Sequence, residues 1–125
     1  MELLINKCKK CGKIIVTLKK SACPTFCCDE PMAQLIAGTT DAAVEKHVPV
    51  VEQSGNICKV TVGSVNHPME EKHFIEWLIL QTEKGFQLKN LKPGEEPKSE
   101  FLLTGDDKFE KAYAYCNLHG LWASK

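Results

Sequence analysis

The stretch "VPVVEQSGNICKVTVGSV", residues 48–65, carries the strongest signal for the fold. Val, Ile and Thr gather on both sides of a polar segment, "QSGN". β-branched side chains favour extended strands, and a short polar segment with Gly between two such runs is typical of a β-hairpin. We therefore expect two antiparallel strands in this stretch.

Further strand signals follow toward the C-terminus. "HFIEWLILQTEKGFQLKNL", residues 73–91, predicts a second hairpin that turns at "EKG". Its first half is apolar almost without interruption, so a short helix is the alternative, but its aromatic and β-branched content favours a strand. We expect "KPGEEPKSE", residues 92–100, to form a polar turn and "FLLTG", residues 101–105, a short strand. Short strands at this spacing predict a mainly β fold, either a sandwich or a small barrel.

The composition limits the functional classes. The chain has 125 residues, is 43% hydrophobic and 26% charged, and carries a formal net charge of zero. A nucleic-acid partner is not expected, because the basic excess typical of such proteins is missing. No apolar run is long enough to span a membrane, and the N-terminal residues do not resemble a signal peptide, so we expect a cytoplasmic protein.

The seven cysteines are unevenly distributed and suggest two modules. Five of them lie between Cys8 and Cys28, whereas all four histidines lie further along the chain. An odd number of cysteines in a reducing compartment favours metal binding over disulfides. We expect a head of residues 1–37 and a body of residues 38–125, with "AGTT" as the linker. A head this small needs a metal or a partner to fold.

In the head, "CKKC" and "CC" supply Cys8, Cys11, Cys27 and Cys28, on either side of a predicted strand in "KIIVTLKK", residues 13–20. Four thiolates suit tetrahedral zinc or a single iron, and the thiolates alone do not separate the two metals. Adjacent cysteine side chains diverge, so both can bind one ion only where the backbone is locally distorted. Cys23 could pair with Cys27 instead, and we interpret it as a spare thiol.

In the body, four histidines and Cys116 are the candidate ligands of a second metal. Each histidine lies in a short charged or glycine-bearing segment: "EKHVP", "NHPMEEKH" or "CNLHG". A lone histidine is more often a surface or hydrogen-bonded residue, but four in such settings weaken that interpretation. Four imidazoles and a thiolate exceed the ligand number of zinc sites and leave one position of an octahedral metal open, which is typical of a redox centre. We interpret the remaining thiol, Cys58, as an ordinary strand residue.

Several separated motifs, in order along nearly the whole chain, resemble those of the desulfoferrodoxin family, the two-iron superoxide reductases. "CKKCG" and "CCDEPM" resemble the family's desulforedoxin-type or rubredoxin-like head. "TTDAAVEKHVPVVE", "VGSVNHPMEEKHFIEWL" and "YCNLHGLW" resemble its neelaredoxin-like body. Cys23 departs from the family pattern and leaves the conformation of its loop open.

The resemblance implies a four-cysteine head followed by an immunoglobulin-like β-sandwich, with one mononuclear iron in each. It also implies one-electron reduction of superoxide to hydrogen peroxide, re-reduction by a rubredoxin-type donor, and a homodimer. The implied equatorial ligands of the catalytic iron are His47, His67, His73 and His119. Cys116 would be the axial ligand, and the head iron would be held by Cys8, Cys11, Cys27 and Cys28.

The tripeptide "EKH" occurs twice, and spacing alone cannot say which Glu-Lys pair faces the metal. By resemblance we assign Lys46 to attracting the anionic substrate and Glu45 to completing the coordination of the oxidised iron. We interpret Lys72 as a solvated charge. A cation beside an open metal site concentrates an anion and stabilises developing negative charge.

Three other functions compete with superoxide reduction. One is an iron electron-transfer or oxygen-sensing protein without turnover, which an open coordination position argues against. Another is a zinc-ribbon binding module, which the five-ligand histidine and cysteine set argues against. The last is dismutation, which an electron-donating thiolate disfavours.

Overall fold

The computed structural model describes residues 3–125, which divide into two compact units. The smaller unit ends at Ile36, and the larger one runs from Ala37 to Lys125. None of the described helices has the length and apolar character needed to cross a bilayer.

The smaller unit is built from short antiparallel strands. A three-stranded sheet has the order β2-β1-β5, and a separate hairpin pairs β3 with β4. Their bounds are β1 Leu4–Lys7, β2 Ile14–Thr17, β3 Phe26–Cys27, β4 Glu30–Pro31 and β5 Ala33–Gln34. The strand predicted in "KIIVTLKK" is confirmed as β2.

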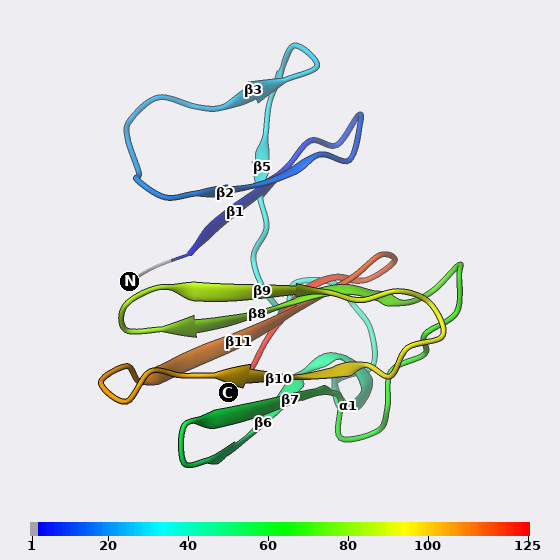
Figure 1. The fold of residues 1–125 in the computed structure, drawn as a ribbon. Coiled ribbons are helices and arrows are strands. Elements are labelled where there is room, and N and C mark those ends of the chain that lie inside the picture. Colours follow the sequence, from blue (N-terminus) through cyan, green and yellow to red (C-terminus); the bar gives the residue numbers. More distant parts are fainter. Residues whose placement is uncertain (1–2) are drawn as a thin grey trace. The chain divides into compact units, whose positions relative to one another are not determined.

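The larger unit is a two-layer β-sandwich with one short helix. One sheet has the order β10-β7-β6 and the other β12-β11-β8-β9, so three strands face four (Figure 1). The elements are α1 Val44–His47, β6 Pro49–Ser54, β7 Ile57–Val62, β8 Ile75–Thr82, β9 Phe86–Asn90, β10 Lys98–Leu102, β11 Phe109–Cys116 and β12 Gly120–Ala123. The predicted mainly β fold with a sandwich body is confirmed.

A single apolar core lies between the two sheets. Val60 of β7 and Phe101 of β10 come from one layer, and Leu78 and Leu80 of β8 come from the other. These side chains are at most 1% exposed. Burying a side chain of this size stabilises the fold by roughly 1.5–3 kcal/mol. The loops at the ends of these strands therefore start from a rigid frame.

Both predicted hairpins are present. β6 pairs with β7 across a two-residue loop in which Gly55 has a positive φ of 59°. β8 pairs with β9 around the predicted "EKG" turn. The alternative of a short helix in the first half of the second hairpin is wrong, because these residues form β8, which pairs with β9 and β11 and has six of its eight residues buried.

The prediction of a polar turn over residues 92–100 is wrong for its last three residues. Lys98, Ser99 and Glu100 begin β10, where they pair with β7. β10 lies at the edge of its sheet, and polar or charged side chains on edge strands keep such edges from pairing with other chains. The polar composition therefore reflects an edge strand rather than a turn.

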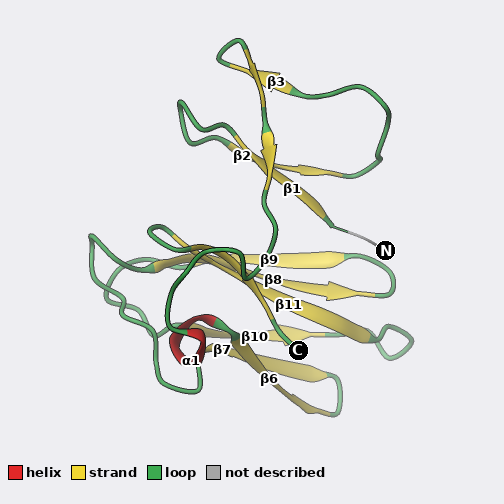
Figure 2. Ribbon diagram, turned by 180° about the vertical axis from the view of Figure 1, so that it is seen from behind, coloured by secondary structure: helices red, strands yellow, loops and turns green. Residues whose placement is uncertain are grey.

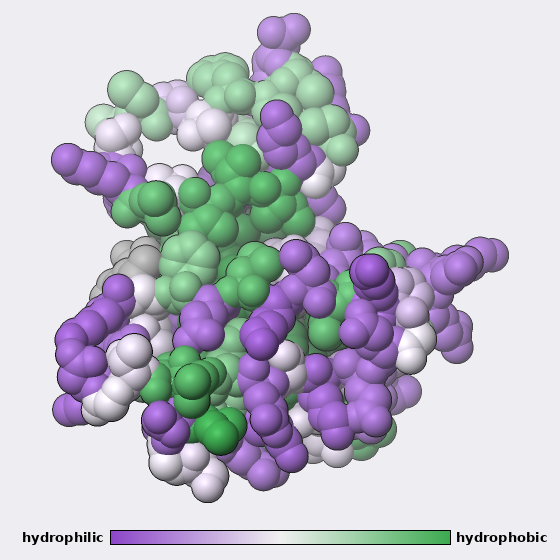
Figure 3. Space-filling view, viewed as in Figure 1, coloured by the Kyte–Doolittle hydropathy of each residue, from purple (hydrophilic) through white to green (hydrophobic). Residues whose placement is uncertain are grey.

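α1 lies at one end of the sandwich, close to the start of β6 (Figure 2). It has four residues and no side-chain cap at its N-terminus, so the surrounding loops and not helix propensity hold it in place. Hydrophilic side chains cover much of the visible face of the larger unit (Figure 3), as expected for strands that bury only one face.

Candidate metal centres

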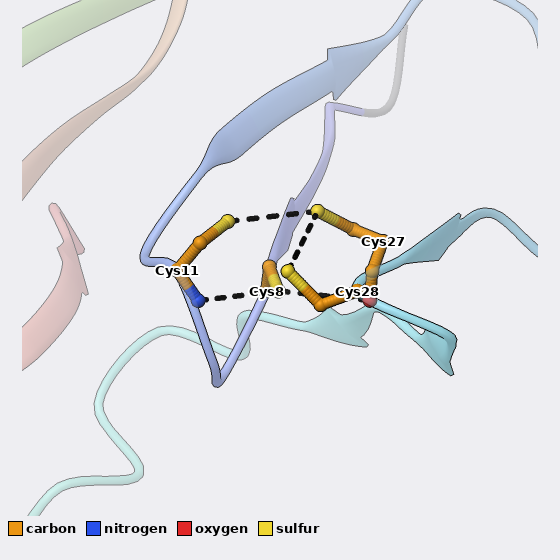
Figure 4. A group of neighbouring side chains, drawn as sticks. All are labelled: Cys8, Cys11, Cys27 and Cys28. Carbon is orange, nitrogen blue, oxygen red and sulfur yellow. Dashed lines mark hydrogen bonds between the residues drawn. The ribbon is translucent and has the colours of Figure 1, made fainter.

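In the smaller unit, four cysteines converge from two turns. Cys8 follows β1, and Cys11 lies in the tight turn that Gly12 closes with a bond from its N–H to the carbonyl of Cys8. Cys27 ends β3, and Cys28 opens the two-residue loop to β4 (Figure 4). All four sulfur atoms lie within 4.8 Å of one another.

The side chains of the adjacent residues Cys27 and Cys28 reach one point because the backbone has an unusual conformation at Cys28. Cys28 and Asp29 have positive φ values of 53° and 62°. Positive φ at both central residues is what a type I′ hairpin turn requires. The distortion expected from the sequence is therefore a turn in the left-handed region, and it directs both thiols inward.

The spacing of the sulfur atoms fits a tetrahedral ion. The Sγ atoms of Cys11 and Cys27 are 3.6 Å apart, and those of Cys27 and Cys28 are 4.0 Å apart. A metal–sulfur bond of about 2.3 Å in a tetrahedron separates its sulfur atoms by about 3.8 Å. The donor set and its spacing therefore fit one metal.

The electrostatics of the smaller unit also call for a cation. The backbone N–H groups of Cys11 and Lys10 and the neighbouring thiols lower the pKa of Cys8 to about 6. Hydrogen bonding with the Cys8 and Cys11 side chains raises the pKa of Cys27 to about 12. Four sulfurs this close cannot all be thiolates unless a positive charge lies among them. Cys23 is exposed and lies outside this group.

In the larger unit, the four histidines come from three separate segments of the chain: α1, the connection from β7 to β8, and the turn from β11 to β12. His47 ends α1, His67 lies between β7 and β8, and His73 lies just before β8. Cys116 is the last residue of β11, and His119 lies in the turn to β12. The stretch "YCNLHGLW" therefore contributes both to the pairing of β11 with β12 and to the histidine–cysteine cluster.

The four imidazole rings form a square. Going round the square in the order His47, His67, His73, His119, neighbouring ring centres are 4.6–5.1 Å apart and the rings meet edge to face. The diagonal from His47 to His73 is longer, at 6.4 Å. Four rings in this order surround a common centre, an arrangement that would suit the ligands of one metal ion.

Two hydrogen bonds establish which ring nitrogens face the centre. The Nδ1 atoms of His47 and His67 lie 2.7 and 2.6 Å from the carbonyls of Ala43 and Pro68, so each Nδ1 carries the donated proton. The two Nε2 atoms therefore have no proton, yet they are only 3.1 Å apart. Two facing lone pairs repel each other, and a cation between them removes that repulsion.

The remaining ligand atoms complete the set. The Nδ1 atom of His119 lies 3.1 Å from His47 Nε2 and 3.8 Å from the sulfur of Cys116. The Nε2 atom of His73 is buried and has no hydrogen-bond partner among residues 3–125. A buried nitrogen without a partner is costly, and a metal ion satisfies it. The structure thus brings all five predicted ligands together, and their nitrogen and sulfur donors suit iron.

The pKa values of this cluster favour neutral imidazoles. Burial lowers the pKa of His67 to about 4 and lowers those of His47 and His73 as well. Neutral rings are the ligand form at neutral pH. Burial raises the pKa of the Cys116 thiol, opposed by the backbone N–H groups of His119 and Leu118. A bound cation reverses the effect of burial and deprotonates the thiol.

Lys46 lies within electrostatic reach of the cluster. Its positive charge is among the influences that lower the pKa values of His47 and His73, although burial is the larger one. The charge of Lys72 affects neither histidine by a comparable amount. Both Lys46 and Glu45 are exposed on α1.

Trp122 forms one wall of the cluster. Its ring stacks on His47 at 4.9 Å, and its indole N–H donates to the carbonyl of His119 at 3.0 Å. Trp77 instead stacks on Tyr115 at 5.2 Å. Cys58 is fully buried in the core, which raises the pKa of its thiol.

Gly63 positions the chain that carries His47, a role that the sequence did not indicate. Its φ is +85°, and a Cβ there would lie 2.8 Å from the carbonyl oxygens of Glu45 and Lys46. Its N–H donates to the carbonyl of Val48, and the N–H of Val65 donates to that of Glu45. The only signal in the sequence is a lone Gly directly after a β-branched strand.

Comparisons with known proteins agree with this geometry. Residues 39–125 match the desulfoferrodoxin family. A desulfoferrodoxin of Nitratidesulfovibrio vulgaris is 49% identical over 97% of this chain and 94% of its own. The superoxide reductase structure of Treponema pallidum covers all of both chains at 42% identity, with a TM-score of 0.84. The one-iron superoxide reductase of Giardia intestinalis is 36% identical over 64% of this chain and 95% of its own, with a TM-score of 0.55. The family match covers most of the larger unit, and similar relatives cover nearly the whole chain. This chain therefore belongs to the desulfoferrodoxin family.

Proposed function

We propose that this protein is a superoxide reductase. The reaction takes up one electron and two protons for each superoxide and yields one hydrogen peroxide. The observation that carries the proposal is the square of four imidazoles with the buried Cys116 thiol beside it and Lys46 within electrostatic reach. The relatives named superoxide reductase support it.

We assign a separate role in the reaction to each of the site residues of the larger unit. Iron held by the four histidines and Cys116 would supply the electron. The thiolate of Cys116 donates electron density, which favours transfer to the substrate. Lys46 attracts the superoxide anion and stabilises the negative charge that develops on its oxygens. Glu45, one residue before Lys46, is our candidate for closing the site in the oxidised protein.

The wider proposal concerns the two domains and the partners. We assign residues 1–37 to a four-cysteine iron domain and residues 38–125 to the catalytic domain, with a rubredoxin-type protein restoring the electron. A homodimer is part of the proposal, supported by Leu18 and Phe26 of the smaller unit, which are 81% and 61% exposed. The cytoplasmic location stays a prediction.

The test is the stoichiometry of the reaction. Reduced, iron-loaded protein is mixed anaerobically with a superoxide pulse, and peroxide and dioxygen are measured. We expect one peroxide for each superoxide consumed, one electron lost from the protein, and no dioxygen. Release of dioxygen together with peroxide would show dismutation instead. Unchanged superoxide decay would support the electron-transfer alternative, which has no turnover.

Replacing Lys46 by alanine is expected to lower the second-order rate constant with superoxide by about 10-fold, because electrostatic steering of an anion is worth at least this much. The dependence of the rate on ionic strength should flatten, since screening acts through the charge that was removed. The measurement is rapid mixing over a series of salt concentrations. Lys72→Ala is the matched control and should change little. Equal losses in the two variants would reject the assignment of Lys46.

A further inference from the structure

The His73 ring is held differently from its neighbours. His47 and His67 each donate a proton from Nδ1 to a backbone carbonyl, which fixes the direction of the ring. Among the described residues, no carbonyl accepts such a bond from His73, and its Nε2 atom has no partner. The position of this ring therefore depends on the backbone that carries it.

The side chain of Asn117 ties that backbone on both sides of His73. The N–H of Phe74 donates to Asn117 Oδ1 at 2.9 Å, and Asn117 Nδ2 donates to the carbonyl of Lys72 at 3.0 Å. The two peptide groups that flank His73 are thus bound to one amide. The N–H and carbonyl of His73 itself are paired with Glu70.

The same asparagine follows directly after Cys116. The ladder between β11 and β8 has an irregularity between Tyr115 and Cys116 and ends there. One step further, the N–H of Asn117 still donates to the carbonyl of Phe74 at 3.2 Å. The side-chain amide then continues the pairing where the main chain turns toward His119. An amide has both the donor and the acceptor that a peptide group offers, so asparagine is suited to this task.

We propose that Asn117 is a positioning residue that fixes His73 relative to Cys116 and His119. Three of the five ligands then depend on one side chain that does not itself face the metal. The inference rests on the proposed function only in that the histidine–cysteine cluster must bind iron.

The first test is Asn117→Ala in the full-length, iron-loaded protein. We expect iron to leave the histidine–cysteine site about 10–100-fold faster in the presence of a chelator, the usual range for losing a partner that orients a ligand. The thiolate-to-iron absorption band and the midpoint potential of that site should shift. The absorption of the four-cysteine site should not change, and it serves as a control within the same molecule.

Two further variants separate positioning from general stability. Asn117→Asp keeps an acceptor for the Phe74 N–H but loses the donor to Lys72, so it should show an intermediate effect. Thr82→Val removes the 2.7 Å hydrogen bond that the buried Thr82, at the opposite end of β8, donates to Asp107. It should lower the melting temperature and leave the band, the potential and the iron release rate unchanged.

The outcomes are distinguishable. Asn117 variants that lose only melting temperature, as Thr82→Val does, would overturn the inference and leave the proposed function intact. Wild-type protein that takes no iron into the histidine–cysteine site would overturn both. If Asn117→Ala does not fold, Asn117→Asp decides: an unshifted band and potential would reject the positioning role.

Discussion

A Gly63→Ala variant is expected to lose about 2–5 kcal/mol of folding stability and to bind iron poorly in the larger unit. The methyl group would lie 2.3 Å from the carbonyl oxygen of Val65 and 2.8 Å from those of Glu45 and Lys46. All three are backbone atoms, so no side chain can rotate away. The left-handed φ of +85° adds strain of its own.

The loss of iron should be confined to the histidine–cysteine site, because the displaced carbonyls lie next to one of its ligands. Glu45 and Lys46 immediately precede His47, and moving their peptide groups moves the ligand. Urea unfolding gives the stability, and metal content with the visible spectrum gives the occupancy of each site. We expect the absorption of the four-cysteine site to persist while the thiolate band of the histidine–cysteine site weakens.

Gly94→Ala is the matched control for this experiment. Gly94 has a similar φ of +91°, but nothing lies within 4 Å of the Cβ that alanine would add. It should therefore lose only the roughly 1–2 kcal/mol of a left-handed alanine and keep both sites. If both variants lose the same stability and keep their iron, the close approach of Gly63 to α1 is not needed to position His47 for metal binding.

Much of the fold could be predicted from local sequence, because both strands of a hairpin and the turn between them lie in one short segment of the chain. The alternation around "QSGN" and the turn at "EKG" predict β6 to β9 with nearly correct bounds. The local pattern places the start of β10 too late, because the first residues of this strand are polar, and its position at a sheet edge explains them. That position is set by pairing with β7, which the local pattern of β10 does not reveal.

The candidate ligands could be predicted as well, since metal donors are few and distinctive residue types. Their arrangement could not. The square of rings depends on carbonyls of Ala43 and Pro68, and every residue has a carbonyl. The roles of Asn117 and Gly63 arise only when distant segments fold together. The adjacent cysteines are intermediate: the need for a distortion was predictable, but its form, a left-handed turn at Cys28, was not.

Replacing Cys116 by alanine is expected to abolish the thiolate-to-iron band of the larger unit and to slow superoxide reduction by at least about 100-fold. Loss of a residue that only orients a ligand costs up to about this factor, and Cys116 is itself a proposed ligand. The measurements are the visible spectrum and rapid mixing with superoxide. Cys58→Ala is the matched control, because Cys58 is equally buried but lies outside the histidine–cysteine cluster. It should lose about 1 kcal/mol of stability and leave the spectrum and rate unchanged.

A serine at position 116 separates two roles of the thiolate. Its oxygen preserves most of the side-chain volume and can still bind a metal, but oxygen is a harder donor than sulfur. If the thiolate is needed for electron donation, Cys116→Ser should retain iron and still react slowly. If its rate is near that of the wild-type protein, the four histidines and Lys46 suffice for the reaction, and Cys116 only holds the metal. Slow reaction with full iron occupancy would assign the chemical role to sulfur, because the imidazole square is the same in both proteins.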